Sequence, residues 1–163
     1  MDRSKIIQIG ILVRDIEAAT KAWAAFLGRP VPVPALTDGY DVTHAVYRGK
    51  PCHGRIYQTA FQLDNLELEL IAPADDETPS YWKECLDRDG EGLHHIAFAA
   101  DDMDASMHKI GALGYEAAQS GVWKDEPENG RYAFMDTRDA LKCTVELLRF
   151  PRADHATEQE ETK

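Results

Sequence analysis

Hydrophobic and polar positions along the chain switch between a strand period and a helix period in one order that occurs twice. Apolar and β-branched side chains fill residues 6–13, which predicts a strand. Asp15 follows as a helix cap, and apolar side chains then recur at helical spacing until Gly28 and Pro30 end the helix. After a proline-rich loop at residues 30–41, three further strands are predicted at residues 42–48, 55–63 and 66–72. The first half is therefore predicted to have the order βαβββ.

The second half repeats this order after a linker. A strand is predicted at residues 93–99 and a helix at residues 102–113, which Gly114 ends. The remaining strands are predicted at residues 116–122, 131–136 and 142–149. We therefore divide the chain into a first βαβββ module at residues 1–72, a linker with a short helix (80–88) at residues 73–92, a second βαβββ module at residues 93–150, and a charged, disordered tail at residues 151–163.

The two halves also match residue by residue. The segment IQIGILVRDIEAA at residues 7–19 returns as HHIAFAADDMDAS at residues 94–106, and LELELI at residues 66–71 returns as CTVELL at residues 143–148. Gln8 thereby matches His95, and Glu69 matches Glu146. A duplicated module with an internal pseudo-twofold axis brings equivalent positions together, so we expect these four side chains to converge on one point.

Composition and charge exclude several classes of function. The chain has 163 residues, 44% of them hydrophobic, and a formal net charge of −11, so it can bury a core but lacks the basic face of a nucleic-acid-binding protein. It contains no run of about 18 apolar residues and no signal-peptide core, so we expect no membrane span and a cytoplasmic location. Three cysteines without CxxC spacing, namely Cys52, Cys85 and Cys143, are predicted to be buried rather than paired.

The four matched side chains are suited to a metal ion. One imidazole, two carboxylates and one amide oxygen form a mixed, oxygen-rich set that suits an octahedral divalent ion with open positions, such as Zn, Ni, Co, Mn or Mg. A structural zinc site would instead use four closed cysteine or histidine ligands. We therefore predict Gln8, Glu69, His95 and Glu146 as metal ligands.

Each of these residues also has a simpler interpretation. Gln8 by itself fits a hydrogen-bonded strand residue. His94 and His95 are neighbours, which strand alternation would place on opposite faces, and only the repeat selects His95. Glu67 and Glu69 share a face, so only the match to Glu146 selects Glu69.

The segments GLHHIAFAADDMDA at residues 92–105 and LELELIAP at residues 66–73 resemble the vicinal oxygen chelate superfamily. This superfamily includes glyoxalase I, methylmalonyl-CoA epimerase, extradiol dioxygenases and bleomycin-resistance proteins, and the resemblance spans residues 5–149. It is strongest to epimerases and to proteins labelled lactoylglutathione lyase. The resemblance implies an α+β fold in which two paired βαβββ modules form a U-shaped mixed sheet around a metal cleft. Gln8 stands where most members have histidine, although the eukaryotic type of glyoxalase I also has glutamine there.

The resemblance further implies a metal-dependent lyase or isomerase of the glyoxalase I or 2-acyl-CoA epimerase type. Such an enzyme removes a proton next to a carbonyl of a small metal-chelated substrate: an acyl-CoA thioester, a glutathione hemithioacetal, or a keto or hydroxy acid. Glu146 is the expected first base, with Glu69 and His53 as candidates for the second. Epimerases carry a second glutamate in the region that corresponds to PCHGR at residues 51–55, which has no carboxylate, and His53 is equally a loop histidine.

Two other functions fit the same cleft. A non-catalytic binding protein of the bleomycin-resistance type would hold its ligand without metal, and a ferrous dioxygenase is disfavoured by Gln8 because that iron site wants two histidines and one carboxylate. Members of the superfamily commonly form homodimers, and we expect one here. The aromatic residues expected to line the cleft are Tyr57, Phe61, Trp123, Tyr132 and Phe134.

Overall fold

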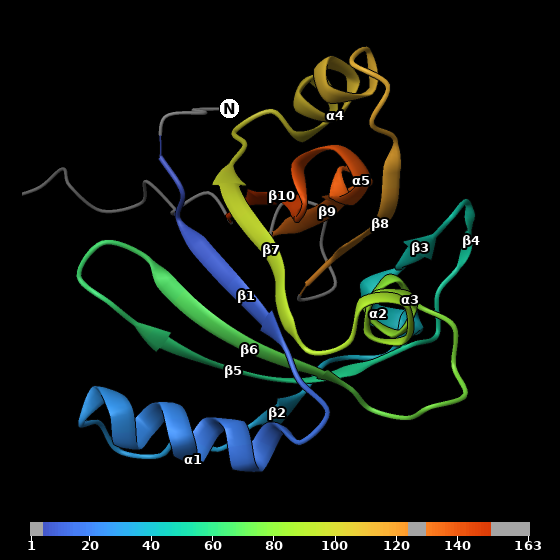
Figure 1. Cartoon of the computed structure of the whole chain (residues 1–163). Coiled ribbons are helices and arrows are strands. Elements are labelled where there is room, and N and C mark those ends of the chain that lie inside the picture. The colour runs from blue at the N-terminus through green and yellow to red at the C-terminus, as the bar shows by residue number, and fades with distance from the viewer. Residues whose placement is uncertain (1–4, 124–129, 151–163) are drawn as a thin grey trace, which may run out of the picture.

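A computed structural model describes residues 5–123 and 130–150, and the predicted tail at residues 151–163 lies outside the described residues. Within them, all strands belong to one ten-stranded mixed sheet with the order β2-β5-β6-β1-β7-β10-β9-β8-β3-β4 (Figure 1). The strands are β1 (Gln8–Leu12), β2 (Ala35–Leu36), β3 (Val46–Tyr47), β4 (Lys50–Pro51), β5 (Ile56–Gln62), β6 (Glu67–Pro73), β7 (Gly92–Ala99), β8 (Ala117–Val122), β9 (Arg131–Met135) and β10 (Thr144–Arg149). The helices are α1 (Ile16–Leu27), α2 (Tyr40–Thr43), α3 (Tyr81–Asp89), α4 (Met103–Gly111) and α5 (Arg138–Leu141).

The order of the sheet contains the repeat seen in the sequence. The four strands β2-β5-β6-β1 of the first half are mirrored by β8-β9-β10-β7 of the second half, and β1 and β7 join the halves as an antiparallel pair. In each half the first strand runs parallel to the last one, β1 beside β6 and β7 beside β10. The predicted α+β fold with a curled mixed sheet is therefore confirmed.

Alternation along the strands separates a core face from a functional face. On β1 and β6, the apolar side chains Ile9, Leu68 and Leu70 pack with α1, whereas Gln8 and Glu69 lie on the other face. As predicted, Asp15 caps α1 by accepting a hydrogen bond from the backbone N–H of Ala18 at 2.9 Å. In the second half, Asp102 caps α4 in the same way.

The predicted strand at residues 42–48 is wrong. Residues 40–43 form the short helix α2, and only Val46 and Tyr47 are extended. Arg48 and Gly49 have φ angles of 45° and 77°, which close a tight hairpin between β3 and β4. This hairpin leaves its own half and pairs with β8, the outer strand of the other half. The outer place in the first half is instead taken by β2, inside the stretch predicted as a loop.

The linker helix α3 is close to the prediction, and it packs against strands of both halves of the sheet. Ser80 caps α3, and its apolar side contributes Tyr81, Trp82 and Leu86 to a core cluster that includes Phe134 of β9. All three cysteines are buried and unpaired, as expected. None of the helices in the described part of the chain has the length and apolar character needed to cross a membrane.

Candidate functional site

The four matched side chains lie together where the two halves of the sheet meet. Gln8 on β1 and Glu69 on β6 come from the first half, and His95 on β7 and Glu146 on β10 from the second half. His95 Nε2 is 3.1 Å from Gln8 Oε1, 3.2 Å from Glu146 Oε2 and 3.4 Å from Glu69 Oε2. The structure thus brings the four side chains to one atom, as the repeat predicted, while their role as metal ligands stays a prediction.

Gly10 makes room for this arrangement. It lies on β1 opposite His95 in the register with β7. A Cβ atom at this position would lie 2.0 Å from His95 Cε1 and 2.3 Å from His95 Nε2, well inside van der Waals contact. The imidazole therefore occupies the space that any other side chain at position 10 would fill.

His94 lies beside His95, against the expectation that alternation would place them on opposite faces. The register between β1 and β7 shifts after the Gly10–His95 pair, since the next residue, Ile11, pairs with Leu93 and leaves His94 as an extra residue. Both histidines are fully buried, and their Nδ1 atoms are 2.9 Å apart. One of these two atoms carries the proton of that hydrogen bond. When it is His95, its Nε2 keeps a lone pair that faces the carboxylates.

Burial sets the charges of these groups. It lowers the pKa of His95 to about 3, so the imidazole is neutral near pH 7 and its contacts with the glutamates are not ion pairs. Burial, reinforced by the charge of Glu67, raises the pKa of Glu69 to about 8. Burial also raises the pKa of Glu146 well above its usual range, with further contributions from Glu69 and Glu67. Among residues 5–123 and 130–150, no Lys or Arg pairs with either of these two carboxyl groups.

The donor set fits a divalent cation. Glu146 Oε2 is buried and lies 3.2 Å from His95 Nε2, yet among the described residues it has no hydrogen-bond partner. Neighbouring ligands of an octahedral ion at about 2.1 Å are about 3 Å apart, close to the observed separations. Within residues 5–123 and 130–150, no group of three or more His, Cys, Asp or Glu side chains has, as placed, the arrangement needed to hold a metal ion. The atoms that would bind an ion are His95 Nε2 and the three oxygens that lie 3.1–3.4 Å from it.

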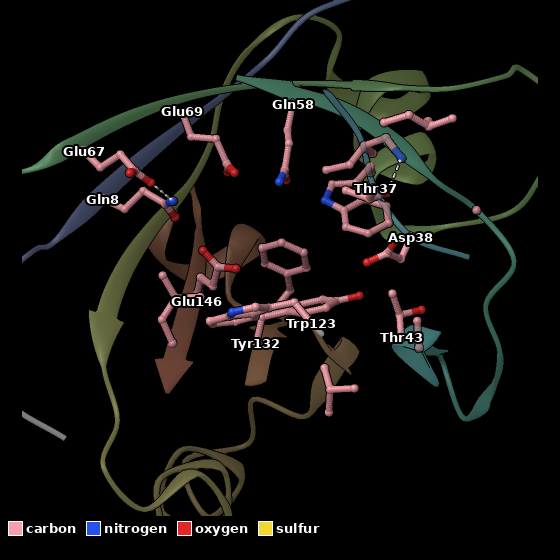
Figure 2. A pocket seen from close by; sticks show the side chains of 18 of the residues that line it. Gln8, Thr37, Asp38, Thr43, Gln58, Glu67, Glu69, Trp123, Tyr132 and Glu146 are labelled. Carbon is pink, nitrogen blue, oxygen red and sulfur yellow. Dashed lines mark hydrogen bonds between the residues drawn. The ribbon is translucent and has the colours of Figure 1, made fainter. Parts of the chain in front are cut away.

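Gln8, Glu69 and Glu146 line one end of a cavity of about 480 Å³, and His95 lies buried behind them. Figure 2 shows Gln8, Glu69 and Glu146 turned toward one another on one side, and Asp38 entering from the opposite side. The aromatic residues of the wall are Trp82, Trp123, Tyr132, Phe134 and Phe150. Of the five aromatic residues expected there, Tyr57 and Phe61 do not line the cavity, since Tyr57 is partly exposed and Phe61 belongs to the core beneath α1.

The predicted second base His53 does not lie at the cavity. Its side chain is exposed and its ring stacks on Tyr40 at a centroid distance of 4.8 Å, so it is a loop histidine. Asp38, which follows β2, lines the cavity instead, together with Thr43 and Gln58. Sequence patterns gave no signal for Asp38, because β2 was hidden within the proline-rich stretch.

Comparison with a family model identifies a match over residues 7–134, to the glyoxalase/bleomycin resistance protein/dioxygenase superfamily. Among curated proteins, the ethylmalonyl-CoA/methylmalonyl-CoA epimerase of Cereibacter sphaeroides is 25% identical over 144 residues, which cover 88% of this chain and 96% of that protein.

Solved structures with the same fold include two methylmalonyl-CoA epimerases. One, in complex with methylmalonyl-CoA and NH4+, has a TM-score of 0.57 and 23% identity, and the match covers 96% of this chain and 98% of that chain. The other, from Mycobacterium tuberculosis, has a TM-score of 0.59 and 21% identity, and the match covers 94% of this chain and 91% of that chain. At these identities the structural matches show the fold alone.

Proposed function

The chain belongs to the glyoxalase/bleomycin resistance protein/dioxygenase superfamily, and we propose that within it the protein is a divalent-metal-dependent enzyme that removes a proton next to the carbonyl of an acyl-CoA thioester. The observation that carries this proposal is the meeting of Gln8, Glu69 and Glu146 at His95 Nε2, at the end of a cavity. These four residues would hold the metal ion. When bound, the ion would supply the positive charge that stabilises an enolate.

The choice of an acyl-CoA rests on similarity and on the cavity. The relative that matches almost the whole chain is named an epimerase of ethylmalonyl-CoA and methylmalonyl-CoA. A cavity of about 480 Å³ has room for a short branched acyl group. Its described lining contains four acidic side chains and no Lys or Arg, so a bound cation would offset their repulsion of a substrate that carries a free carboxylate. The four acidic side chains are Asp38, Glu67, Glu69 and Glu146.

Glu146 is the base in this proposal. Among the described residues its Oε2 has no hydrogen-bond partner, and burial raises its pKa, so in its ionised form the carboxylate is a stronger proton acceptor than an exposed one. The walls of Trp82, Tyr132 and Phe134 exclude water from the reacting carbon.

Epimerisation requires a second acid–base group on the other face of the same carbon. His53 is outside the cavity, whereas Asp38 faces the glutamates across it (Figure 2). We therefore assign Asp38 the role of returning the proton to the opposite face. Glu146 takes the proton from one face, and the Asp38 carboxyl group delivers a proton to the other, so that each cycle inverts the carbon and exchanges the two protonation states.

The test is proton exchange in D2O. Metal-loaded protein is incubated with each epimer of methylmalonyl-CoA and ethylmalonyl-CoA, and exchange and inversion are followed by NMR. We expect exchange with inversion in the wild type and loss of both in Glu146→Gln. Asp38→Asn should keep exchange at one epimer but lose inversion by about 100-fold or more. Absence of exchange in a metal-loaded wild type would contradict the proposal and favour a ligand-binding role, with hemithioacetals as the next substrates to test.

A further inference from the structure

Gln8 has a hydrogen-bond partner that the repeat does not account for. Its Nε2 donates to Glu67 Oε1 at 2.8 Å, and Glu67 pairs with it directly in the parallel register of β1 and β6 (Figure 2). Gln8 is 8% exposed and Glu67 is half-buried, so this bond is partly shielded from solvent.

The equivalent pair in the second half is different. There His95 of β7 pairs with Thr144 of β10 in the same parallel register. Thr144 does not bond to His95; its hydroxyl lies 3.2 Å from the Tyr81 hydroxyl. The two halves therefore differ at two paired positions. Gln8 stands where the second half has His95, and Glu67 stands where it has Thr144. Gln8 and Glu67 form a hydrogen bond with each other.

The partner decides which end of the amide faces the centre. An amide has an oxygen and a nitrogen end of nearly the same shape, and it can be turned over at little steric cost. An ionised carboxylate only accepts hydrogen bonds, so Glu67 selects the Gln8 nitrogen and turns the Gln8 oxygen toward His95 Nε2, 3.1 Å away. In the reversed amide, an NH2 group would face the centre, and it cannot bind a cation.

We propose that Glu67 is a positioning residue that orients the Gln8 amide so that its oxygen faces the centre formed by His95, Glu69 and Glu146. This inference rests on the metal-dependent function proposed above. Each of the two proposed ligands on the first strand of its half then has a neighbour that orients it. Glu67 orients Gln8, and His94 orients His95 through the contact between their Nδ1 atoms.

The experiment measures affinity for Zn²⁺ and Co²⁺ by competition with a chromogenic chelator, using purified full-length protein. Glu67→Gln keeps the size of the side chain but can accept or donate, so the Gln8 amide loses its fixed direction. We expect affinity to fall by about 10- to 100-fold, the effect of losing an outer partner of a ligand. The unfolding midpoint of the metal-free variant, measured in parallel, should stay close to that of the wild type.

Two further variants separate orientation from charge. Asp38→Asn removes one charge from the same cavity without touching Gln8, and its affinity should change by less than about three-fold. The double variant Gln8→Glu/Glu67→Gln has the same total charge as the wild type. In it the new amide at position 67 donates to the new carboxylate at position 8, so an oxygen of residue 8 again faces the centre. Its metal affinity should therefore return to near the wild-type value.

Equal losses in Glu67→Gln and Asp38→Asn, or no loss in Glu67→Gln, would overturn the inference while leaving the proposed function standing. Failure of the wild type to bind either ion would overturn both.

Discussion

Replacement of Gly10 by alanine tests whether the position of His95 depends on the missing side chain. The added Cβ would lie 2.0–2.4 Å from three atoms of the imidazole ring, so the ring must retreat by about 1 Å or more, or β1 must separate from β7. Overpacking of this kind costs about 1–3 kcal/mol. Gly10 has no positive φ angle, so alanine is otherwise favourable in this strand, by about 0.5–1 kcal/mol.

The two effects are separated by a double-mutant cycle. In the wild-type background, Gly10→Ala should lower the free energy of unfolding by about 1–3 kcal/mol, measured by urea denaturation of metal-free protein. In a His95→Ala background the ring is gone, and the same change should be neutral or stabilising. The coupling energy should therefore be about 1–4 kcal/mol. An equal cost of Gly10→Ala in both backgrounds would refute the reasoning, because the cost would then come from the backbone or from β6.

Three further changes follow from the site. Metal-free protein should lose stability as pH rises from about 4.5 toward 8, because burial raises the pKa of Glu69 in the folded state and the group must ionise there. The loss should be smaller in Glu69→Gln. Equal urea midpoints of the wild type at pH 5 and pH 8 would contradict this. His53→Ala should leave exchange rates within about two-fold of wild type in the D2O assay, since the ring lies outside the cavity, and a loss above ten-fold would reinstate it as a base. Arg138→Ala should lower the free energy of unfolding, measured by urea denaturation, by about 2–3 kcal/mol and weaken metal binding. The reason is that the Arg138 guanidinium donates hydrogen bonds to the Leu93 and His94 carbonyls. An unchanged free energy of unfolding would show that water replaces these bonds.

The sequence predicted those features that depend on local periodicity and on the repeat. Alternation placed Gln8 and Glu69 on one face of their strands, and capping by Asp15 placed the first helix. The internal match then related Gln8 to His95 and Glu69 to Glu146, and the structure brings these four together. These inferences required only that neighbouring residues follow a strand or helix period and that the two halves of the chain share one order of elements.

The features that were missed depend on pairing between distant segments. The bulge that turns His94 and His95 to the same side comes from a change in the register of β7 against β1, which no pattern within β7 reveals. The hairpin of β3 and β4 pairs with β8, about 70 residues further along the chain, so its own half gave no reason to separate it from the neighbouring strands. Asp38 likewise reaches the cavity only because the two-residue strand β2 pairs with β5.

The short strands at the two ends of the sheet also bear on aggregation. A curled sheet of this width would normally expose two long rows of free backbone N–H and C=O groups, which are templates for pairing with other chains. In the described part of the chain the outermost strands are β2 and β4, each two residues long, and β4 consists of Lys50 and Pro51. A lysine repels an apolar strand from another chain, and a proline has no N–H to donate. The hairpin that crosses to β8 therefore covers the middle of that strand with an edge that is poorly suited to pair with another chain.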